Sequence, residues 1–565
     1  MSEFYTNISM RGNHILLRGY SNGEPIQEKV RFQPTLFLPS KNKTEYRTLD
    51  GYYLESINPG DISDCREFIK KYDNISGFKI HGNTDYIYQF IGENYKGDVD
   101  YDFSQIKVAT IDIECESEHG FPKPENANER INAITVDYNG FVYVYGLGEF
   151  HLDDTSYDGK LRQFKFETEE ELLESFISTW ELESPDAVTG WNVRFFDIPY
   201  LINRIGIVLG ESSAKRLSPW KILKERSIRK MNRENQTYEI SGVATLDYYE
   251  LYQTFTYVNQ ESYRLDHIAF VELGEKKLSY DEYDSMATFY QNNFQKFIEY
   301  NVKDVELIKK LEDKMKLLEL AVSLAYSAKV NFMDVFGQVR TWDCIIYHYL
   351  MEHNIIIPPK TTSKKDTQYA GAYVKDPIVG MHDWVVSFDL NSLYPHLIMQ
   401  YNISPETMVP DNKDSSISPD SILNGKVVSH DAYSVAANGT CYTREHQGFL
   451  PALMEKLYKE RKMYKNKMIE CQKRQQAGEK NLEKDIAKYN NFQLVRKIQL
   501  NSAYGAIGNE WFRYFDVDMA EAITLSGQLS IRWIADKLNE FLNKTIGTED
   551  YDYVVASDTD SVYLR

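Results

Sequence analysis

The sequence predicts a soluble, multidomain α/β protein. Its 565 residues are too many for one hydrophobic core, so several domains are expected. Strand-like apolar runs alternate with helical patterns through the first 300 residues, which is typical of α/β domains. Hydrophobic residues make up 42% and aromatic residues 14% of the chain, which excludes a disordered protein. No apolar run reaches the ~18 residues that a membrane span needs.

The charge is distributed unevenly along the chain. A net charge of −20 argues against a polyanionic partner, because nucleic-acid binding depends on Lys and Arg. However, residues 455–497 contain 13 Lys and Arg against 6 Asp and Glu, so this segment is suited to phosphates. The five cysteines form no C-x-x-C pair, and neither a disulfide framework nor a zinc site is expected. The N-terminus lacks a signal or transit pattern, which favours the cytoplasm.

The elements of the N-terminal half follow in order. Residues 1–105 combine the runs "HILLRGY" and "PTLFLPS" with a helical pattern, which predicts a small α/β module. The strand "IKVATIDIE" then opens a second α/β domain with alternating strands and helices. Residues 226–241 have the alternation and turn-like centre of a β-hairpin. The expected helices of this half lie near residues 61–72, 168–182, 199–209 and 305–355.

The C-terminal half predicts a different arrangement. The strand "WVVSFDL" is followed by a long basic helical pair at about 449–506, which is broken near "QQAGEKN". A further helix, "AEAITLSGQLSIRWIADKLNEFL", leads into a terminal strand, turn and strand that end at Arg565.

One acidic set lies in the second α/β domain. Asp112 and Glu114 in "TIDIECES" are two apart on a strand and leave the same face, although a solvated strand face is the alternative. Asp197 lies in an aromatic run, where an unpaired carboxylate is costly to bury. Tyr300 and Asp304 share a helical face. Convergence of these acids predicts a site for two Mg²⁺ ions that hydrolyse a phosphodiester, with Tyr300 orienting the water.

A second set lies in the C-terminal half. Asp389 ends an apolar strand in "VVSFDLNSLYPH", and Asp558 and Asp560 occupy the terminal turn "SDTDSVY", where ordinary turn chemistry is the alternative. Two groups of polar residues fall on single helical faces, although a solvated basic helix is the alternative for the second. These groups are Lys497, Asn501 and Tyr504, and Arg461 and Lys465.

The first set resembles the motifs of DnaQ-like 3′→5′ exonucleases, namely D-x-E, N-x-x-x-F-D and Y-x-x-x-D in that order. This resemblance implies an RNase H-like domain in which Phe121 of "HGFPKP" lies beside a frayed primer end, an ordinary loop aromatic being the alternative. It also implies the metal ligands Asp112, Glu114, Asp197 and Asp304.

The second set resembles the motifs of family B DNA polymerases. The matching segments are D-x-x-S-L-Y-P at Asp389, D-T-D-S at the end, K-x-x-x-N-S-x-Y-G at Lys497 and "YAGAY" in place of Y-x-G-G/A. The resemblance implies two Mg²⁺ ions at each active site, with Mn²⁺ as a substitute. The implied polymerase metal ligands are Asp389, Asp560 and the carbonyl of Leu390, with Asp558 as a lesser ligand.

The same resemblance assigns the substrate contacts, and it names Tyr394 as the steric gate against ribonucleotides and Lys497 as the proton donor to pyrophosphate. The implied nucleotide contacts are Ser392, Leu393, Tyr394, Arg461, Lys465, Lys497 and Asn501. The implied DNA contacts are Tyr369, Gly371, Ala372, Tyr504, Gly505 and Phe121.

Segments such as "TGWNVRFFDIPY" and "GNEWFRYFD" are similar to the replicative polymerases of T-even-like bacteriophages. This implies a DNA-templated DNA polymerase with a proofreading exonuclease, which acts on primer-template DNA and dNTPs in the cytoplasm of an infected bacterium. The predicted segments are an N-terminal domain with its connector (1–105 and 317–360), an exonuclease (106–316), a palm (361–448 and 510–565) and helical fingers (449–509).

By the same resemblance, the chain ends before the remaining palm strands, the thumb and the segment that binds a sliding clamp, so it is expected to be split or truncated. Residues 561–565 are expected to form an unpaired edge strand that pairs with a second polypeptide. Two rival functions stay open. They are a stand-alone exonuclease with an inactive polymerase part and an RNA-binding translational repressor.

Overall fold

The computed structural model describes residues 3–565 apart from residues 73–74, 76–77, 119, 154–159, 231–232, 257, 361–368, 427 and 429. The chain forms two compact units. The first comprises Met1–Pro34, Gly60–Arg66 and Asp85–Phe336, and the second comprises Thr35–Pro59, Glu67–Thr84 and Gly337–Arg565. This division is coarser than the five predicted segments, whose boundaries stay a prediction.

The first unit is built on a six-stranded mixed sheet of order β10-β9-β8-β7-β11-β14. β7, β8 and β9 are antiparallel neighbours, whereas β11 and β14 continue the sheet in parallel beside β7, and β10 runs parallel to β9. The strands are β7 (Val108–Cys115), β8 (Ile131–Tyr138), β9 (Phe141–Leu147), β10 (Leu161–Phe166), β11 (Ala187–Thr189) and β14 (Ala244–Thr245).

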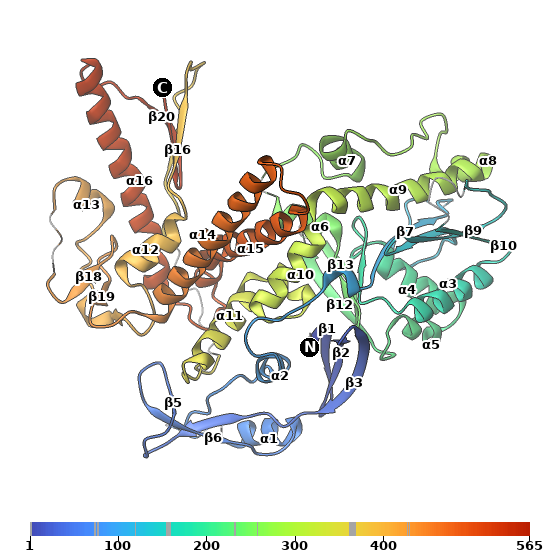
Figure 1. Ribbon diagram of the computed structural model, residues 1–565, viewed down its shortest axis with the longest axis horizontal. Helices are drawn as coiled ribbons and strands as arrows, with labels where there is room; N and C mark the ends of the chain where they lie inside the picture. The colour runs from blue at the N-terminus through green and yellow to red at the C-terminus, as the bar shows by residue number, and fades with distance from the viewer. Residues whose placement is uncertain are drawn as a thin grey trace. The chain divides into compact units, whose positions relative to one another are not determined.

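Helices cover both faces of this sheet (Figure 1). On one face, α3 (Glu169–Glu183) and α4 (Asp197–Val208) pack on alternate β7 side chains such as Ile111 and Ile113. On the other face lie α8 (Met286–Asn292) and α9 (Phe294–Met315). Because strand side chains alternate, Asp112 and Glu114 leave β7 on the face opposite Ile111 and Ile113.

The other elements of the first unit include the predicted hairpin, which is confirmed as β12 (Leu223–Lys230) paired with β13 (Arg233–Ile240). A three-stranded antiparallel sheet consists of β1 (Glu3–Arg11), β2 (His14–Ser21) and β3 (Glu24–Arg31). The remaining helices are α2 (Tyr86–Asn94), α5 (Glu211–Ala214), α6 (Tyr248–Phe255), α7 (Leu265–Leu273) and α10 (Leu317–Ala328), and α1 (Ile62–Tyr72) spans the boundary between the units.

A buried ionic cluster joins the N-terminal sheet to the mixed sheet. Arg18 donates to the carbonyl oxygen of Gly242 at 2.7 Å and lies 3.5 Å from the carboxylate of Asp186. That carboxylate also accepts hydrogen bonds from Thr6 and Tyr20, each at 2.8 Å. Removing one partner of a buried pair typically costs about 3–5 kcal/mol, so this cluster fixes the first unit as one body.

The second unit contains a four-stranded antiparallel sheet of order β15-β20-β21-β16. The prediction that residues 561–565 form an unpaired edge is wrong. β21 is an inner strand, because it pairs with β20 on one side and with β16 on the other, where Val386 lies opposite Leu564. The strands are β15 (Val374–Lys375), β16 (Val386–Asp389), β20 (Val554–Asp558) and β21 (Ser561–Leu564).

Long helices form the rest of this unit. The predicted basic pair is confirmed as α14 (Phe449–Gln476) and α15 (Glu483–Ile507), and α16 (Val517–Ile546) packs on the terminal sheet through Ile531. The shorter helices are α11 (Gln338–Glu352), α12 (Leu393–Tyr401) and α13 (Pro419–Leu423). Two small sheets contain β4 (Leu36–Pro39), β5 (Tyr46–Arg47) and β6 (Tyr53–Ile57), and β17 (Met408–Val409), β18 (Tyr433–Val435) and β19 (Cys441–Thr443).

Two expectations from composition can be compared with the fold. All five cysteines are buried and none forms a disulfide. Among the described residues, no helix combines the length and the apolar character that crossing a bilayer requires.

Candidate functional site

Four carboxylates from three elements meet beside β7 in the first unit. Asp112 and Glu114 come from β7 and Asp304 from α9, and their carboxylate oxygens lie within 4.8 Å of one another. Asp197 is the first residue of α4, and its Oδ1 accepts a hydrogen bond from the backbone N–H of Ile113 at 3.1 Å. The fold therefore brings together the four acids that the sequence analysis selected.

Burial raises the pKa of every one of these acids, and the charges of nearby carboxylates add to the effect. Burial, followed by the charges of neighbouring carboxylates, raises the pKa of Asp112 well above its ordinary value and that of Glu114 to about 8. Burial also raises the pKa of Asp197 to about 7 and that of Asp304 to about 6.

A divalent cation fits this cluster. Oδ1 of Asp304 is buried and has no hydrogen-bond partner in the structure, which leaves a carboxylate oxygen ready to act as a ligand. Carboxylate oxygens are the ligands that hard divalent cations prefer, and a cation would relieve the repulsion between Asp112, Glu114 and Asp304.

Lys277 is a member of this site that the sequence analysis missed. Its ammonium group forms an ion pair with Asp304 and donates a hydrogen bond to the Tyr300 hydroxyl at 3.0 Å. Burial alone would lower the pKa of Lys277, but the charge of Asp304 raises it overall, so this lysine stays protonated. Lys277 belongs to none of the motifs, and its neighbour Lys276 has the same residue type, so no signal in the sequence distinguishes it.

Asn301 is a second residue that the motifs did not indicate. Its fully buried amide donates to Oδ2 of Asp112 at 2.7 Å and accepts a hydrogen bond from the Thr135 hydroxyl at 2.5 Å. Its position between Tyr300 and Asp304 was the one feature of the sequence that could have indicated a role for Asn301 in this site. Asn301 thus orients the carboxylate of Asp112 from the neighbouring helix.

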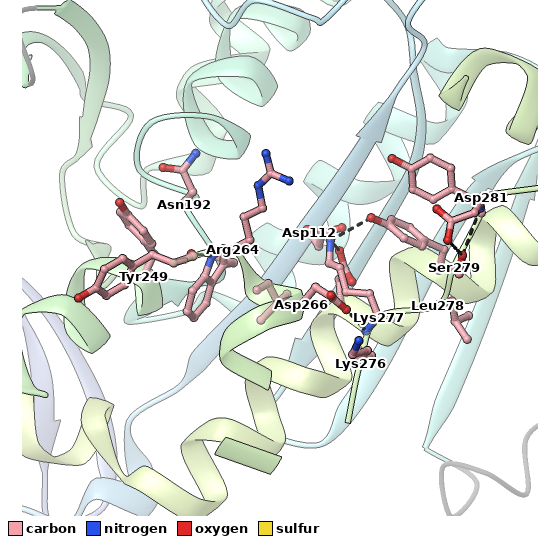
Figure 2. Close-up of a pocket in the computed structure, with 16 residues that line it drawn as sticks. Asp112, Asn192, Tyr249, Arg264, Asp266, Lys276, Lys277, Leu278, Ser279 and Asp281 are labelled. Carbon is pink, nitrogen blue, oxygen red and sulfur yellow. Dashed lines mark hydrogen bonds and ion pairs between the residues drawn. The ribbon is translucent and has the colours of Figure 1, made fainter. Parts of the chain in front are cut away.

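An open cleft of about 920 Å³ runs along this cluster. Figure 2 shows Asp112 and Lys277 between Asn192 and Tyr249 on one side and Ser279 and Asp281 on the other. Near Tyr249, the indole ring of Trp191 lies 5.8 Å from the Tyr249 ring. Aromatic rings beside a cation such as Arg264 form the type of surface that binds single-stranded nucleic acid.

Phe121 lies on a separate loop of the same unit. Its side chain is 81% exposed, and its ring centroid lies 5.5 Å from that of Phe196, the residue before Asp197. An exposed phenylalanine held against another ring next to a carboxylate of the cluster is available for contact with a base.

The second predicted acidic set lies at the end of the terminal sheet in the second unit. Asp389 is the last residue of β16 and pairs with Ser561, and the backbone N–H of Leu390 donates to the Asp560 carbonyl at 2.7 Å. Burial, followed by the charges of Asp389 and Asp558, raises the pKa of Asp560. This set is more open than the first, because among the described residues only Asp112, Glu114 and Asp304 form a group of three acids within 4.8 Å.

Cationic side chains of α14 and α15 lie near this second set. Arg461 donates to the Ser392 hydroxyl at 3.3 Å, and the charges of Arg461 and Asp389 both act on Lys497. Burial, then the charge of Arg461, lowers the pKa of Lys497, although Asp389 opposes this effect. Lys465 lies one turn beyond Arg461 and is exposed. Cations and carboxylates therefore gather at the same place, as binding of a triphosphate with its metal requires.

Three tyrosines line the same region. The rings of Tyr394 and Tyr504 lie 4.8 Å apart, and the Tyr504 hydroxyl donates to that of Tyr369 at 3.3 Å. Gln528 holds the backbone of Gly371 through a hydrogen bond of 2.7 Å to its carbonyl oxygen. The other predicted contacts lie on these elements, with Ser392 and Leu393 at the start of α12, Asn501 and Gly505 on α15, and Ala372 before β15.

Comparison with known proteins identifies the family. Residues 335–565 match the model of DNA polymerase family B, and residues 50–268 match that of its exonuclease domain. The chain is 34% identical over 632 residues to the DNA-directed DNA polymerase of Escherichia phage RB69. This match covers 100% of this chain and 69% of that protein. The chain belongs to DNA polymerase family B. The predicted resemblance is thereby confirmed.

Other relatives agree with this assignment. The chain is 32% identical over 631 residues to the DNA-directed DNA polymerase of Enterobacteria phage T4, with 100% of this chain and 70% of that protein covered. It is 26% identical over 477 residues to the DNA polymerase delta catalytic subunit of Schizosaccharomyces pombe, with 81% of this chain and 42% of that protein covered. The match to the family B exonuclease domain ends at residue 268, yet the fold adds Tyr300 and Asp304 to its acidic cluster.

We predict that Asn301→Ala lowers the rate of DNA digestion by this site about 10–100-fold, the usual cost of losing a group that orients a metal ligand. Thr135→Val, which removes only the group that orients Asn301, should have a smaller effect in the same direction. Digestion of 3′-labelled single-stranded DNA measures both. The control is Asn292→Ala, an exposed amide of α8, and a wild-type rate for Asn301→Ala would contradict the positioning of Asp112 by this amide.

Proposed function

We propose that this chain is a DNA-templated DNA polymerase of the phage replicative type, with an intrinsic 3′→5′ proofreading exonuclease. The observation that carries this proposal is the presence, in one family B chain, of two separate acidic sites. Asp112, Glu114 and Asp304 form one, and Asp389 and Asp560 belong to the other. The substrates would be primer-template DNA and dNTPs, and the proposed location is the cytoplasm of an infected bacterium.

In the exonuclease, Asp112, Glu114, Asp197 and Asp304 would hold divalent cations, with Mg²⁺ proposed and Mn²⁺ as a substitute. When bound, such ions stabilise the charge that develops on the attacking and leaving oxygens of a phosphodiester. Tyr300 would orient the attacking water, and Lys277 would hold the Tyr300 hydroxyl in place. The antiparallel β7, β8 and β9 followed by parallel β11 support an RNase H-like domain.

In the polymerase, Asp389, Asp560 and the carbonyl of Leu390 would hold the cations, with Asp558 as a lesser ligand. The cationic side chains of α14 and α15, namely Arg461, Lys465 and Lys497, would bind the triphosphate together with Ser392, Leu393 and Asn501. Because burial and Arg461 lower the pKa of Lys497, its ammonium group is a better proton donor to the leaving pyrophosphate.

Contacts to DNA would come from several loops and helices. The segment that contains Tyr369, Gly371 and Ala372 would touch the template, since the Gly371 backbone is open to close approach. Tyr504 and Gly505 would contact the DNA from α15. In the exonuclease, Phe121 would stack on a base of the frayed primer end.

We predict that the double substitution Asp112→Ala with Glu114→Ala lowers digestion of single-stranded DNA from its 3′ end by several orders of magnitude, because it removes ligands of both cations. Release of labelled mononucleotides in Mg²⁺ measures the rate. Asp389→Ala, which belongs to the other unit, is the matched control and should digest DNA normally. Digestion at the wild-type rate by the double variant would show that the site is misassigned.

We predict that Tyr394→Ala relaxes the selection against ribonucleotides by about tenfold or more, because its ring would fill the space of a 2′-hydroxyl. The space around the ring is tight, since a Cβ added at Gly527 would lie 2.8 Å from Cε1 of Tyr394. The ratio of ribonucleotide to deoxynucleotide incorporation, measured in the presence of the second polypeptide proposed below, gives the change. Tyr394→Phe keeps the ring and should keep the selection, and loss of selection in that variant would point to a hydrogen bond instead.

We also propose that a second polypeptide supplies further palm strands, a thumb and the contact with a sliding clamp. Support comes from β16, which lies at the edge of its sheet and exposes Val386 (51%) and Phe388 (54%). The loop before it exposes Met381 (97%) and Trp384 (93%). An apolar edge strand with uncovered neighbours is a surface on which another strand can pair.

We predict that this chain alone digests DNA but extends primers negligibly, because the second polypeptide would supply the grip on the primer duplex. The proposed second polypeptide should co-elute with the chain and restore primer extension. The substitution Phe388→Lys should weaken that association, whereas Phe541→Lys on exposed α16 is the control. Processive extension by the purified chain alone would overturn the proposal.

A further inference from the structure

The loop that carries Phe121 is hydrogen-bonded to α4. Residues 121–130 follow β7 and have no regular secondary structure. From α4, the Tyr200 hydroxyl donates to the carbonyl of Glu129 at 2.7 Å. One turn further along, Asn203 donates to the carbonyl of Pro124 at 2.7 Å, three residues from Phe121. These hydrogen bonds from α4 therefore position the loop that carries this exposed phenylalanine.

The side chain of Asn203 also binds the β12–β13 hairpin. Its Nδ2 donates to Oε1 of Gln236 at 3.0 Å, and its Oδ1 accepts a hydrogen bond from the Tyr238 hydroxyl at 2.6 Å. Gln236 in turn donates to Glu225 on the partner strand at 2.9 Å. Both hydrogens and the oxygen of the Asn203 amide are thus used, one toward the loop and two toward the hairpin.

We propose that Asn203 is a positioning residue that couples the Phe121 loop to the β12–β13 hairpin and sets both relative to the acidic cluster. Asp197 begins the same helix six residues earlier, which is about 9 Å along its axis. A single helix, α4, then carries Asp197 of the cluster at its start and, in its middle, Asn203, which binds both the loop and the hairpin. This inference rests on the proposed exonuclease function.

The coupling should affect binding of the DNA 3′ end rather than cleavage of the phosphodiester bond. Phe121 is 81% exposed and packs against the ring of Phe196, so its place depends on that one contact and on the hydrogen bonds that hold its loop. Asn203 makes no hydrogen bond to any of the four carboxylates. Its loss should therefore weaken binding of a frayed 3′ end and leave the chemistry at Asp112 and Glu114 intact.

The test compares two substrates in the full chain. For Asn203→Ala, KM for a duplex with a mismatched 3′ end should rise about tenfold, as expected for losing buried hydrogen bonds. Its kcat should stay within about twofold of the wild-type value, because the cluster is untouched. Hydrolysis of the p-nitrophenyl ester of thymidine 5′-monophosphate, which reaches only the carboxylates, should not change. A fall in hydrolysis of this ester would overturn the proposal.

Two further variants separate coupling from simple loss of structure. In a Phe121→Ala background, Asn203→Ala should add little to the rise in KM, because both substitutions remove the same contact. Fully additive effects would overturn the coupling. Tyr238→Phe removes only the bond from the hairpin and should raise KM in the same direction, and an unchanged KM would remove the hairpin from the proposal. A wild-type chain that hydrolyses neither substrate would instead refute the exonuclease function itself.

Discussion

The crowding of acids beside β7 is the constraint on which the first unit depends. Two carboxylates at the 4.8 Å limit of this cluster repel each other by about 3 kcal/mol at an effective dielectric constant near 20. Groups from different elements offset this repulsion. The backbone N–H of Ile113 binds Asp197, Asn301 binds Asp112, and Lys277 pairs with Asp304. The start of α4 and the middle of α9 must therefore meet at β7 for the cluster to exist.

In the second unit, the repulsion between the acids is reduced in a different way. Its acids lie at the ends of paired strands, and Asp389 and Asp558 are exposed, so water screens much of their repulsion. The register that places Asp389 opposite Ser561 fixes the spacing through backbone hydrogen bonds. Cations such as Lys497 come from a separate helix. An open site of this type suits a substrate that brings its own negative charge and metal.

The sequence predicted local features better than it predicted distant pairings. The spacing of Asp112 and Glu114 and the hairpin at 226–241 follow from periods of two residues, which the sequence displays directly. The prediction of an unpaired edge strand was wrong because the partner of β21 lies more than 170 residues earlier in the sequence, and short apolar runs carry no information about sheet order. Lys277 and Asn301 were missed for a related reason, since each meets its carboxylate only through tertiary structure.

The geometry of α9 shows why the first cluster is rigid. Phe297, Ile298 and Val302 pack in the apolar core against β8 and β9, whereas Asp304 faces the cleft and Tyr300 lies between the core and the cleft. One residue of an α-helix corresponds to a rotation of about 100°, so turning α9 by one position would pull its apolar side chains out of the core. The packing of the sheet therefore fixes the direction of Asp304. Carboxylates held in this way on a helix and a strand are more precisely placed than carboxylates on loops.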